Sequence, residues 1–152
     1  MTTTTRQPQT IENNMRIYDS YTDLEKKIMD DTGCKIYSGT GINNRLERES
    51  SILRSVDDTS YYKDDLSNPC NISYTLCGQI GDQDLNHRLN KTLLDPKKIK
   101  NIYLYRKVLE NGKCMGYMWY GKYKLDRNNI KKKIHPDRNG NLRKIYLCTL
   151  TK

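Results

Sequence analysis

The sequence predicts an α+β fold that is mostly β, a curled antiparallel sheet or barrel that carries two helices. Apolar residues occur in short segments separated by turn residues, and only two stretches have helical spacing. Two Asn-Gly pairs, Asn111-Gly112 and Asn139-Gly140, favour hairpins between the later strands. The 152 residues include 12 Tyr but no Phe and no Ala, so strand-forming Ile and Tyr must supply much of the core.

The chain is expected to form one domain after a short arm. Residues 1–14 are polar and rich in Thr, which predicts a disordered segment. Residues 15–152 show neither repeats nor an internal linker, and their number suits a single domain. No apolar stretch is long enough to span a membrane or to act as a secretory signal. We therefore expect an intracellular protein, nuclear or cytoplasmic, without a membrane partner.

Two helices are predicted from capping residues and apolar spacing. The first covers residues 21–31, because Ser20 is a suitable N-cap and Gly33 a suitable stop. The second covers Asp82–Leu94, where three leucines recur on one face.

Six segments are predicted to be strands. They are short, rich in β-branched or aromatic residues, and bounded by turn residues. The predicted strands are Lys35–Ser38, Asn71–Leu76, Asn101–Val108, Cys114–Leu125, Asn129–Ile134 and Arg143–Leu150.

Residues suited to catalysis or metal binding are scattered. The five cysteines contain no Cys-x-x-Cys pair, which indicates neither a zinc site nor a disulfide framework, and we expect buried thiols. Glu25-x-Lys27 and His135–Asn139 match only fragments of nuclease motifs, and no deaminase signature is present. The sequence therefore predicts no enzyme activity, no cofactor and no metal site.

Basic side chains are concentrated late in the chain. The formal charge is +9, and residues 96–152 hold 16 Lys and Arg against 3 Asp and Glu. This distribution favours a nucleic acid partner, although solvated strand faces and an AT-rich gene, as in some viruses, would give a similar composition. The candidate phosphate contacts are Lys97, Lys98, Lys100, Lys131, Lys132, Lys133, Arg143 and Lys144.

The segments Tyr61–Asp65 and Ile72–Gly78 contain the groups that a flipped base requires. They offer aromatic faces for stacking, a hydroxyl, and carboxylates. An ionised Asp accepts a hydrogen bond from the cytosine amine, whereas thymine presents an acceptor at that position. The alternative is a surface turn with an acidic tip and core tyrosines.

These segments resemble the SRA (SET and RING associated, or YDG) domain family. Its signature runs Tyr-x-Asp-Asp, about eight residues, Tyr-Thr-Gly-x-Gly, then Asp-Gln-x-Leu and an Asn, and a later strand carries Tyr-Asp-Gly. The matching residues here are Tyr62–Asp65, Tyr74–Gly78, Asp82–Leu85, Asn90 and Trp119–Leu125. Leu76 stands in place of the Gly of Tyr-Thr-Gly, and Tyr120 in place of the Asp of Tyr-Asp-Gly. The resemblance covers about residues 36–150 of a trimmed, divergent member.

The resemblance implies a PUA-like β barrel that binds double-stranded DNA and flips a modified cytosine, 5-methyl or 5-hydroxymethyl, into a pocket. It implies that Tyr62 and Tyr74 sandwich the base and that Asp65 bonds its polar edge. Thr75 would complete the recognition through its backbone and hydroxyl, while Asp64 would shape the loop.

Two alternatives stay open. In the first, the chain is the recognition subunit of a modification-dependent nuclease, and a separate effector protein is a further partner. In the second, the chain is a degenerate PUA-like barrel that binds RNA or a protein.

Overall fold

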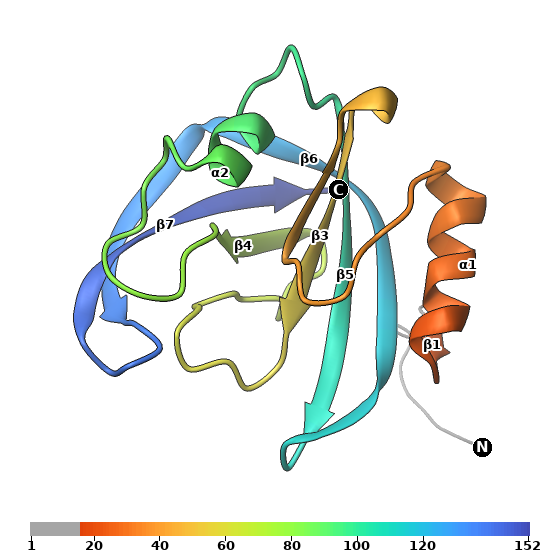
Figure 1. The fold of residues 1–152 in the computed structure, drawn as a ribbon, viewed down its shortest axis with the longest axis horizontal. Helices are drawn as coiled ribbons and strands as arrows, with labels where there is room; N and C mark the ends of the chain where they lie inside the picture. The colour runs from red at the N-terminus through yellow and green to blue at the C-terminus, as the bar shows by residue number, and fades with distance from the viewer. Residues whose placement is uncertain (1–15) are drawn as a thin grey trace.

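A single curved sheet of seven strands forms the body of the molecule (Figure 1). The computed structural model describes residues 16–152, so the arm predicted over residues 1–14 lies outside the described residues. The strand order is β2-β3-β5-β6-β7-β4, and β1 pairs with β6 beside this path. Neighbouring strands are antiparallel except β3 and β5. The predicted mostly β fold with two helices is confirmed, although the sheet curls without closing into a barrel.

The elements have the following bounds. The strands are β1 (Ile17–Tyr18), β2 (Ile42–Arg45), β3 (Ser50–Val56), β4 (Asn71–Thr75), β5 (Asn101–Glu110), β6 (Lys113–Pro136) and β7 (Leu142–Thr151). The helices are α1 (Tyr21–Thr32), α2 (Arg88–Leu93) and the short 3-10 helix η2 (Leu46–Arg48).

The first predicted helix is confirmed as α1. The Ser20 side chain accepts a hydrogen bond from the first turn, and Gly33 ends the helix at a φ of +71°. Leu24 and Ile28 are fully buried, and they pack with Tyr105 of β5 in a small apolar cluster. This cluster attaches α1 to the outer face of the sheet, at the right of Figure 1.

The second predicted helix is too long. Only Arg88–Leu93 is helical, because Gln83 pairs with β7 instead and the residues between it and the helix form a turn. The Gln83 amide donates to the Lys144 carbonyl at 2.9 Å, which gives this segment strand-like pairing. Side-chain spacing alone did not reveal this partner strand.

The strand predictions hold for β4, β5 and β7 and fail elsewhere. The predicted strand Lys35–Ser38 has no strand partner, whereas β1, β2 and β3 were not predicted. β3 was missed because its two faces meet different cores, with Ile52 under α1 and Leu53 inside the curl, so its pattern does not alternate. The two predicted strands within residues 113–136 are one strand, β6, interrupted by a bulge.

The main core fills the inside of the curl. Leu53, Tyr74, Leu104 and Leu150 belong to it, from four different strands, and α2 covers it through Leu93. No helix in residues 16–152 combines the length and apolar character that crossing a membrane requires.

The expectation of buried cysteine thiols is partly wrong. Cys34 and Cys148 are buried and Cys77 is half-buried, but Cys70 and Cys114 are exposed. Cys70 lies in the turn before β4 and Cys114 lies at the β5–β6 hairpin, and neither side chain reaches a core there.

Candidate nucleic-acid interface

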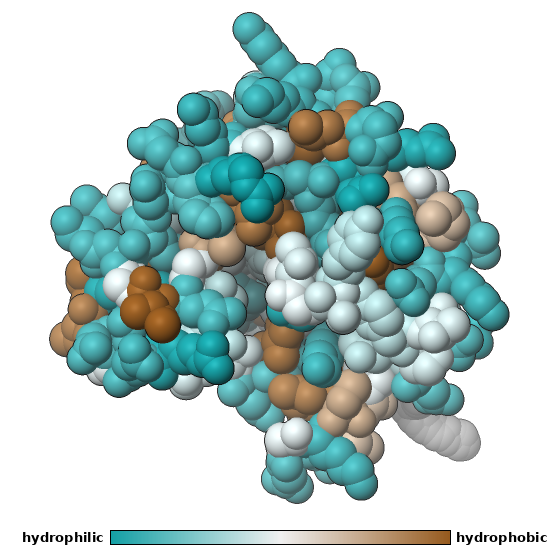
Figure 2. Space-filling view, in the orientation of Figure 1, coloured by the Kyte–Doolittle hydropathy of each residue, from teal (hydrophilic) through white to brown (hydrophobic). Residues whose placement is uncertain are grey.

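A cavity of about 490 Å³ opens beside the end of β4. This volume lies within the range of about 300–1,000 Å³ that is usual for small-molecule sites. Tyr62, Tyr74 and Thr75 all line it, so the fold brings three of the four predicted base-binding residues together. Figure 2 shows that this face of the molecule is hollowed near its centre and is otherwise largely hydrophilic.

Tyr74 forms an inner wall of the cavity. Its side chain points into the main core from β4 and is only 3% exposed. Its hydroxyl lies 3.1 Å from the carbonyl oxygens of Gly41 and Arg54 and donates to them. Burial raises the pKa of Tyr74 well above its ordinary value. The ring is therefore fixed between β4, β3 and the turn before β2.

Tyr62 forms a second wall from the loop between β3 and β4. Its hydroxyl accepts a hydrogen bond from the Gly78 amide at 3.4 Å, so the ring reaches across to the chain that leaves β4. Tyr61 packs edge to face against it, with ring centroids 4.9 Å apart. Burial raises the pKa of Tyr62 to about 12. Tyr62 is close enough to Tyr74 to raise the pKa of that residue too.

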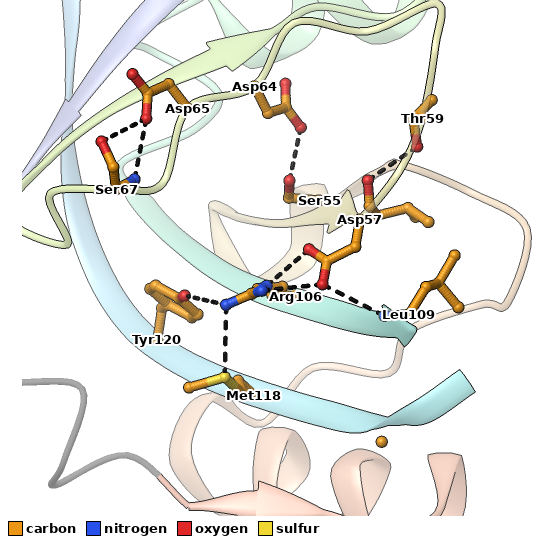
Figure 3. Close-up of polar contacts among 12 residues, drawn as sticks. Ser55, Asp57, Thr59, Asp64, Asp65, Ser67, Arg106, Leu109, Met118 and Tyr120 are labelled. Carbon is orange, nitrogen blue, oxygen red and sulfur yellow. Dashed lines mark hydrogen bonds and ion pairs between the residues drawn. The ribbon is translucent and has the colours of Figure 1, made fainter. Parts of the chain in front are cut away.

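Asp65 does not line this cavity. It is exposed, and its Oδ1 accepts hydrogen bonds from the Ser67 amide at 3.0 Å and the Ser67 hydroxyl at 2.7 Å (Figure 3). These bonds hold the pKa of Asp65 below its ordinary value. The backbone of Asp65 pairs with Ser73 in an isolated bridge, so successive side chains there alternate in direction. That alternation directs Asp64 inward and Asp65 outward.

Asp64 shapes the loop, as the resemblance implied. Its Oδ2 accepts from the Ser55 hydroxyl and its Oδ1 from the Thr75 amide, both at 2.7 Å. Burial raises the pKa of Asp64, while these hydrogen bonds oppose the rise. The Thr75 hydroxyl accepts from the Lys63 amide at 2.8 Å. The amide and hydroxyl of Thr75 are thus both engaged inside the protein.

Gln83 and Asn90 hold the chain that leaves β4. Gln83 Nε2 donates to the Leu76 carbonyl at 2.6 Å and to the Gly78 carbonyl at 3.1 Å. Asn90 accepts from the Cys77 amide at 2.8 Å and donates to the Cys77 carbonyl at 3.1 Å. Both side chains are buried. The Asp-Gln-x-Leu motif and its Asn were noticed in the sequence, but their role as supports of the cavity wall was not.

The prediction that Arg143 contacts DNA is wrong. Arg143 is only 3% exposed, because its guanidinium is bonded to backbone carbonyls. Nη1 donates to Gly78 at 2.6 Å and to Gly81 at 3.2 Å, and Nη2 donates to Tyr61 at 2.6 Å. Arg143 therefore ties the loop that bears Tyr62 to the chain that follows β4.

The other candidate phosphate contacts are on the surface. They lie in two regions, the loop before β5 and the β6–β7 hairpin, which are well separated in Figure 1. Lys100 pairs with Glu49 at 3.1 Å. The exposed residues are Lys97, Lys98, Lys100, Lys131, Lys132, Lys133 and Lys144.

A second cavity of about 360 Å³ shares Tyr62 with the first and has a polar lining. Arg106 donates to both carboxylate oxygens of Asp57, at 2.7 and 2.9 Å, and to the Tyr120 hydroxyl at 3.5 Å (Figure 3). These groups join β5 and β6 to the end of β3. Within residues 16–152, no group of three or more His, Cys, Asp or Glu side chains is arranged to hold a metal ion.

No protein-family model matches the sequence, and no curated protein matches it. Solved structures do match its fold. The sulfur binding and SRA domains of ScoMcrA, complexed with phosphorothioated DNA, align with a TM-score of 0.59 at 15% identity, over 96% of this chain and 40% of that one. The modification-dependent restriction endonuclease TagI aligns with a TM-score of 0.54 at 15% identity, over 91% of this chain and 48% of that one.

The match to an isolated domain is more nearly complete. The SUVH5 SRA domain, bound to fully hydroxymethylated CG DNA, aligns with a TM-score of 0.58 at 17% identity, over 91% of this chain and 87% of that one. This chain thus spans less than half the length of TagI and ScoMcrA but most of the SUVH5 domain. Residues 16–152 have the fold of SRA domains, as the sequence resemblance implied.

Proposed function

We propose that the protein binds double-stranded DNA and takes a flipped modified cytosine, 5-methyl or 5-hydroxymethyl, into the cavity between Tyr62 and Tyr74. The observation that carries this proposal is the cavity itself, open and walled by both tyrosines in a fold shared with SRA domains. Stacking on aromatic rings contributes about 1–3 kcal/mol per base, which offsets much of the cost of unstacking it. Phosphate contacts supply the rest of the affinity.

The DNA seen with the structural neighbours supports this class of ligand. The SUVH5 SRA domain is bound to hydroxymethylated CG DNA in one structure and to methylated CHH DNA in another. ScoMcrA is complexed with phosphorothioated DNA. Each of these neighbours is thus seen in complex with chemically modified DNA.

The carboxylate that reads the cytosine amine is proposed to be Asp65. Asp64 is buried with two partners and is fixed as part of the scaffold. The carboxylate of Asp65 is held by exposed bonds to Ser67 alone, which cost little to exchange for a ligand. Its lowered pKa keeps it ionised near neutral pH, the state that accepts from the amine. Binding therefore requires Asp65 to leave Ser67, and its backbone pairing with Ser73 to change, so that the outward-facing carboxylate can turn toward the cavity.

This function is tested by measuring binding to three otherwise identical duplexes, which carry C, methyl-C or hydroxymethyl-C at one site. Each binding measurement is made at two salt concentrations. The protein should prefer at least one modified duplex, and Asp65→Ala should abolish the preference while keeping the salt-sensitive affinity. Asp64→Asn is the matched control, which should keep the preference. Equal affinity of the wild-type protein for all three duplexes, with a steep salt dependence, would leave only a basic polyanion binder.

A second candidate is the recognition subunit of a modification-dependent nuclease that works with a separate effector protein. It is favoured by the alignment of this chain with less than half of TagI and of ScoMcrA, both restriction endonucleases. In either case we propose that this chain reads DNA and has no catalytic activity of its own. Incubation of modified DNA with the pure protein and Mg²⁺ should leave the DNA uncut.

A further inference from the structure

Two side chains of the β6–β7 hairpin, His135 and Arg143, contact the loop that carries Tyr62. They lie directly opposite each other in the antiparallel ladder, so both project from the same face of the sheet. His135 Nε2 lies 2.9 Å from the Ser60 carbonyl oxygen. Arg143 Nη2 donates to the Tyr61 carbonyl oxygen at 2.6 Å. This hairpin pair, His135 and Arg143, thus binds two successive backbone carbonyls immediately before Tyr62.

Both members of the hairpin pair are donors in these contacts. A carbonyl oxygen can only accept, so His135 Nε2 carries the proton. Arg143 is buried and forms no ion pair within residues 16–152. Its acceptors are three backbone carbonyls, those of Tyr61, Gly78 and Gly81. Because a buried charge is costly unless it is hydrogen-bonded, Arg143 favours the arrangement that keeps the Tyr61 carbonyl in place.

Tyr62 depends on its backbone for its position. Its ring has open space on two sides, because Tyr62 lines both the cavity of about 490 Å³ and the polar cavity of about 360 Å³. The hydrogen bond from the Gly78 amide to its hydroxyl is long, at 3.4 Å. After Tyr62, the Lys63 amide donates to the Thr75 hydroxyl and fixes the chain there. Before Tyr62, the hairpin pair gives the corresponding support.

We propose that His135 and Arg143 are positioning residues, which hold Tyr62 where it stacks on the flipped base. This inference rests on the proposed function, since the stacking partner is the modified cytosine. A ring that is already held in place loses less conformational freedom when the base enters, which strengthens binding. The effect is confined to DNA whose base has left the duplex. The hairpin pair therefore strengthens binding to modified DNA and contributes little to unmodified DNA.

The test compares His135→Ala and His135→Gln with wild type on a duplex carrying one modified cytosine and on its unmodified counterpart. His135→Ala should bind the modified duplex about fivefold more weakly, as expected when one hydrogen bond is lost. Binding to the unmodified duplex should stay nearly unchanged. His135→Gln should restore most of the affinity, because its side-chain amide donates to the same carbonyl. Ile134→Ala, at an exposed neighbour on the opposite face of β6, is the matched control and should leave both affinities unchanged.

Arg143→Lys tests the second member of the pair. Lysine keeps the charge but lacks the planar fork of donors, so it cannot bond the Tyr61 and Gly78 carbonyls together in the same geometry. The variant should weaken binding to the modified duplex at least as much as His135→Ala does. Thermal unfolding checks that Arg143→Lys is folded, and the His135 variants carry the test if it is not.

A fluorescent base analogue beside the modified cytosine separates positioning from general stability, because its emission changes when the neighbouring base leaves the stack. At saturating protein, His135→Ala should show a smaller flipped fraction than wild type. Ile28→Val, which loosens the apolar cluster under α1, should lower thermal stability and leave that fraction unchanged.

Equal weakening on both duplexes, no weakening on either, or no recovery in His135→Gln would overturn the positioning role. Failure of the wild-type protein to discriminate the duplexes would instead overturn the proposed function, and this result is read before the variants are compared.

Discussion

The Tyr74 hydroxyl joins three segments of chain through the Gly41 and Arg54 carbonyls. Tyr74→Phe keeps the aromatic wall but removes the hydroxyl that bonds both carbonyls, and the Gly41 carbonyl keeps only its hydrogen bond from the Arg54 amide, so the variant should destabilise the protein by about 1 kcal/mol. Discrimination of modified DNA should survive, because the ring remains. Urea unfolding measures the first effect and duplex binding the second. Tyr146→Phe is the control, since its ring packs on the same core. If Tyr74→Phe leaves the free energy of unfolding unchanged, the hydroxyl does not hold the wall in place.

Asp64 and Asp65 are adjacent carboxyls with opposite pKa shifts. Burial raises the folded-state pKa of Asp64 above its ordinary 3.8, so Asp64 makes stability fall as pH rises from 3.8 through the folded value. As the pH rises through this range, Asp64→Asn should therefore become more stable relative to wild type. Asp65 has a lowered pKa, so its small contribution is present above 3.8 and is lost as pH falls through the folded value. Thermal unfolding against pH should show opposite trends for Asp64→Asn and Asp65→Asn, and parallel curves would contradict this assignment.

Among the secondary-structure elements, β1 depends on a glycine in β6. Gly116 has a φ of +126°, and a Cβ there would lie 2.9 Å from both Ile17 Cγ2 and the Tyr18 carbonyl oxygen. Gly116→Ala should displace β1 and destabilise the protein by about 1–3 kcal/mol. Gly140→Ala is the control, because it has a φ of +85° but open space around it. Amide hydrogen exchange at Tyr18 should rise only in Gly116→Ala, and equal exchange in both variants would rule out the clash.

For the whole molecule, the lysines of the β6–β7 hairpin are expected to provide general attraction to DNA. Replacement of Lys131, Lys132 and Lys133 by Gln should weaken binding to modified and to unmodified duplexes by the same factor. The slope of log K against log salt should fall by about one for each phosphate group that the variant no longer neutralises. Titrations at several salt concentrations measure this. Weakening confined to modified DNA would instead place the hairpin at the flipped nucleotide.

Local patterns in the sequence were enough for α1, whereas the resemblance to SRA domains was needed to bring two tyrosine-bearing segments together. Ser20 and Gly33 act on the backbone within one turn of helix, so their effect is readable without the fold. Tyr62 and Tyr74 are separated by a single turn, and the family spacing placed both at one site, where the structure also has them. β3 was not found, because a strand covered on both faces has no alternating pattern to detect.

The sequence by itself determined the mostly β fold and the first helix through periodicity and capping, and its resemblance to SRA domains implied the aromatic walls of the cavity. Only the tertiary structure decided that Arg143 is buried and that Asp64 rather than Asp65 points inward. Each of those outcomes depends on which distant backbone group a side chain meets. The same Arg or Asp is a solvated surface charge or a buried support according to where the sheet brings its partners.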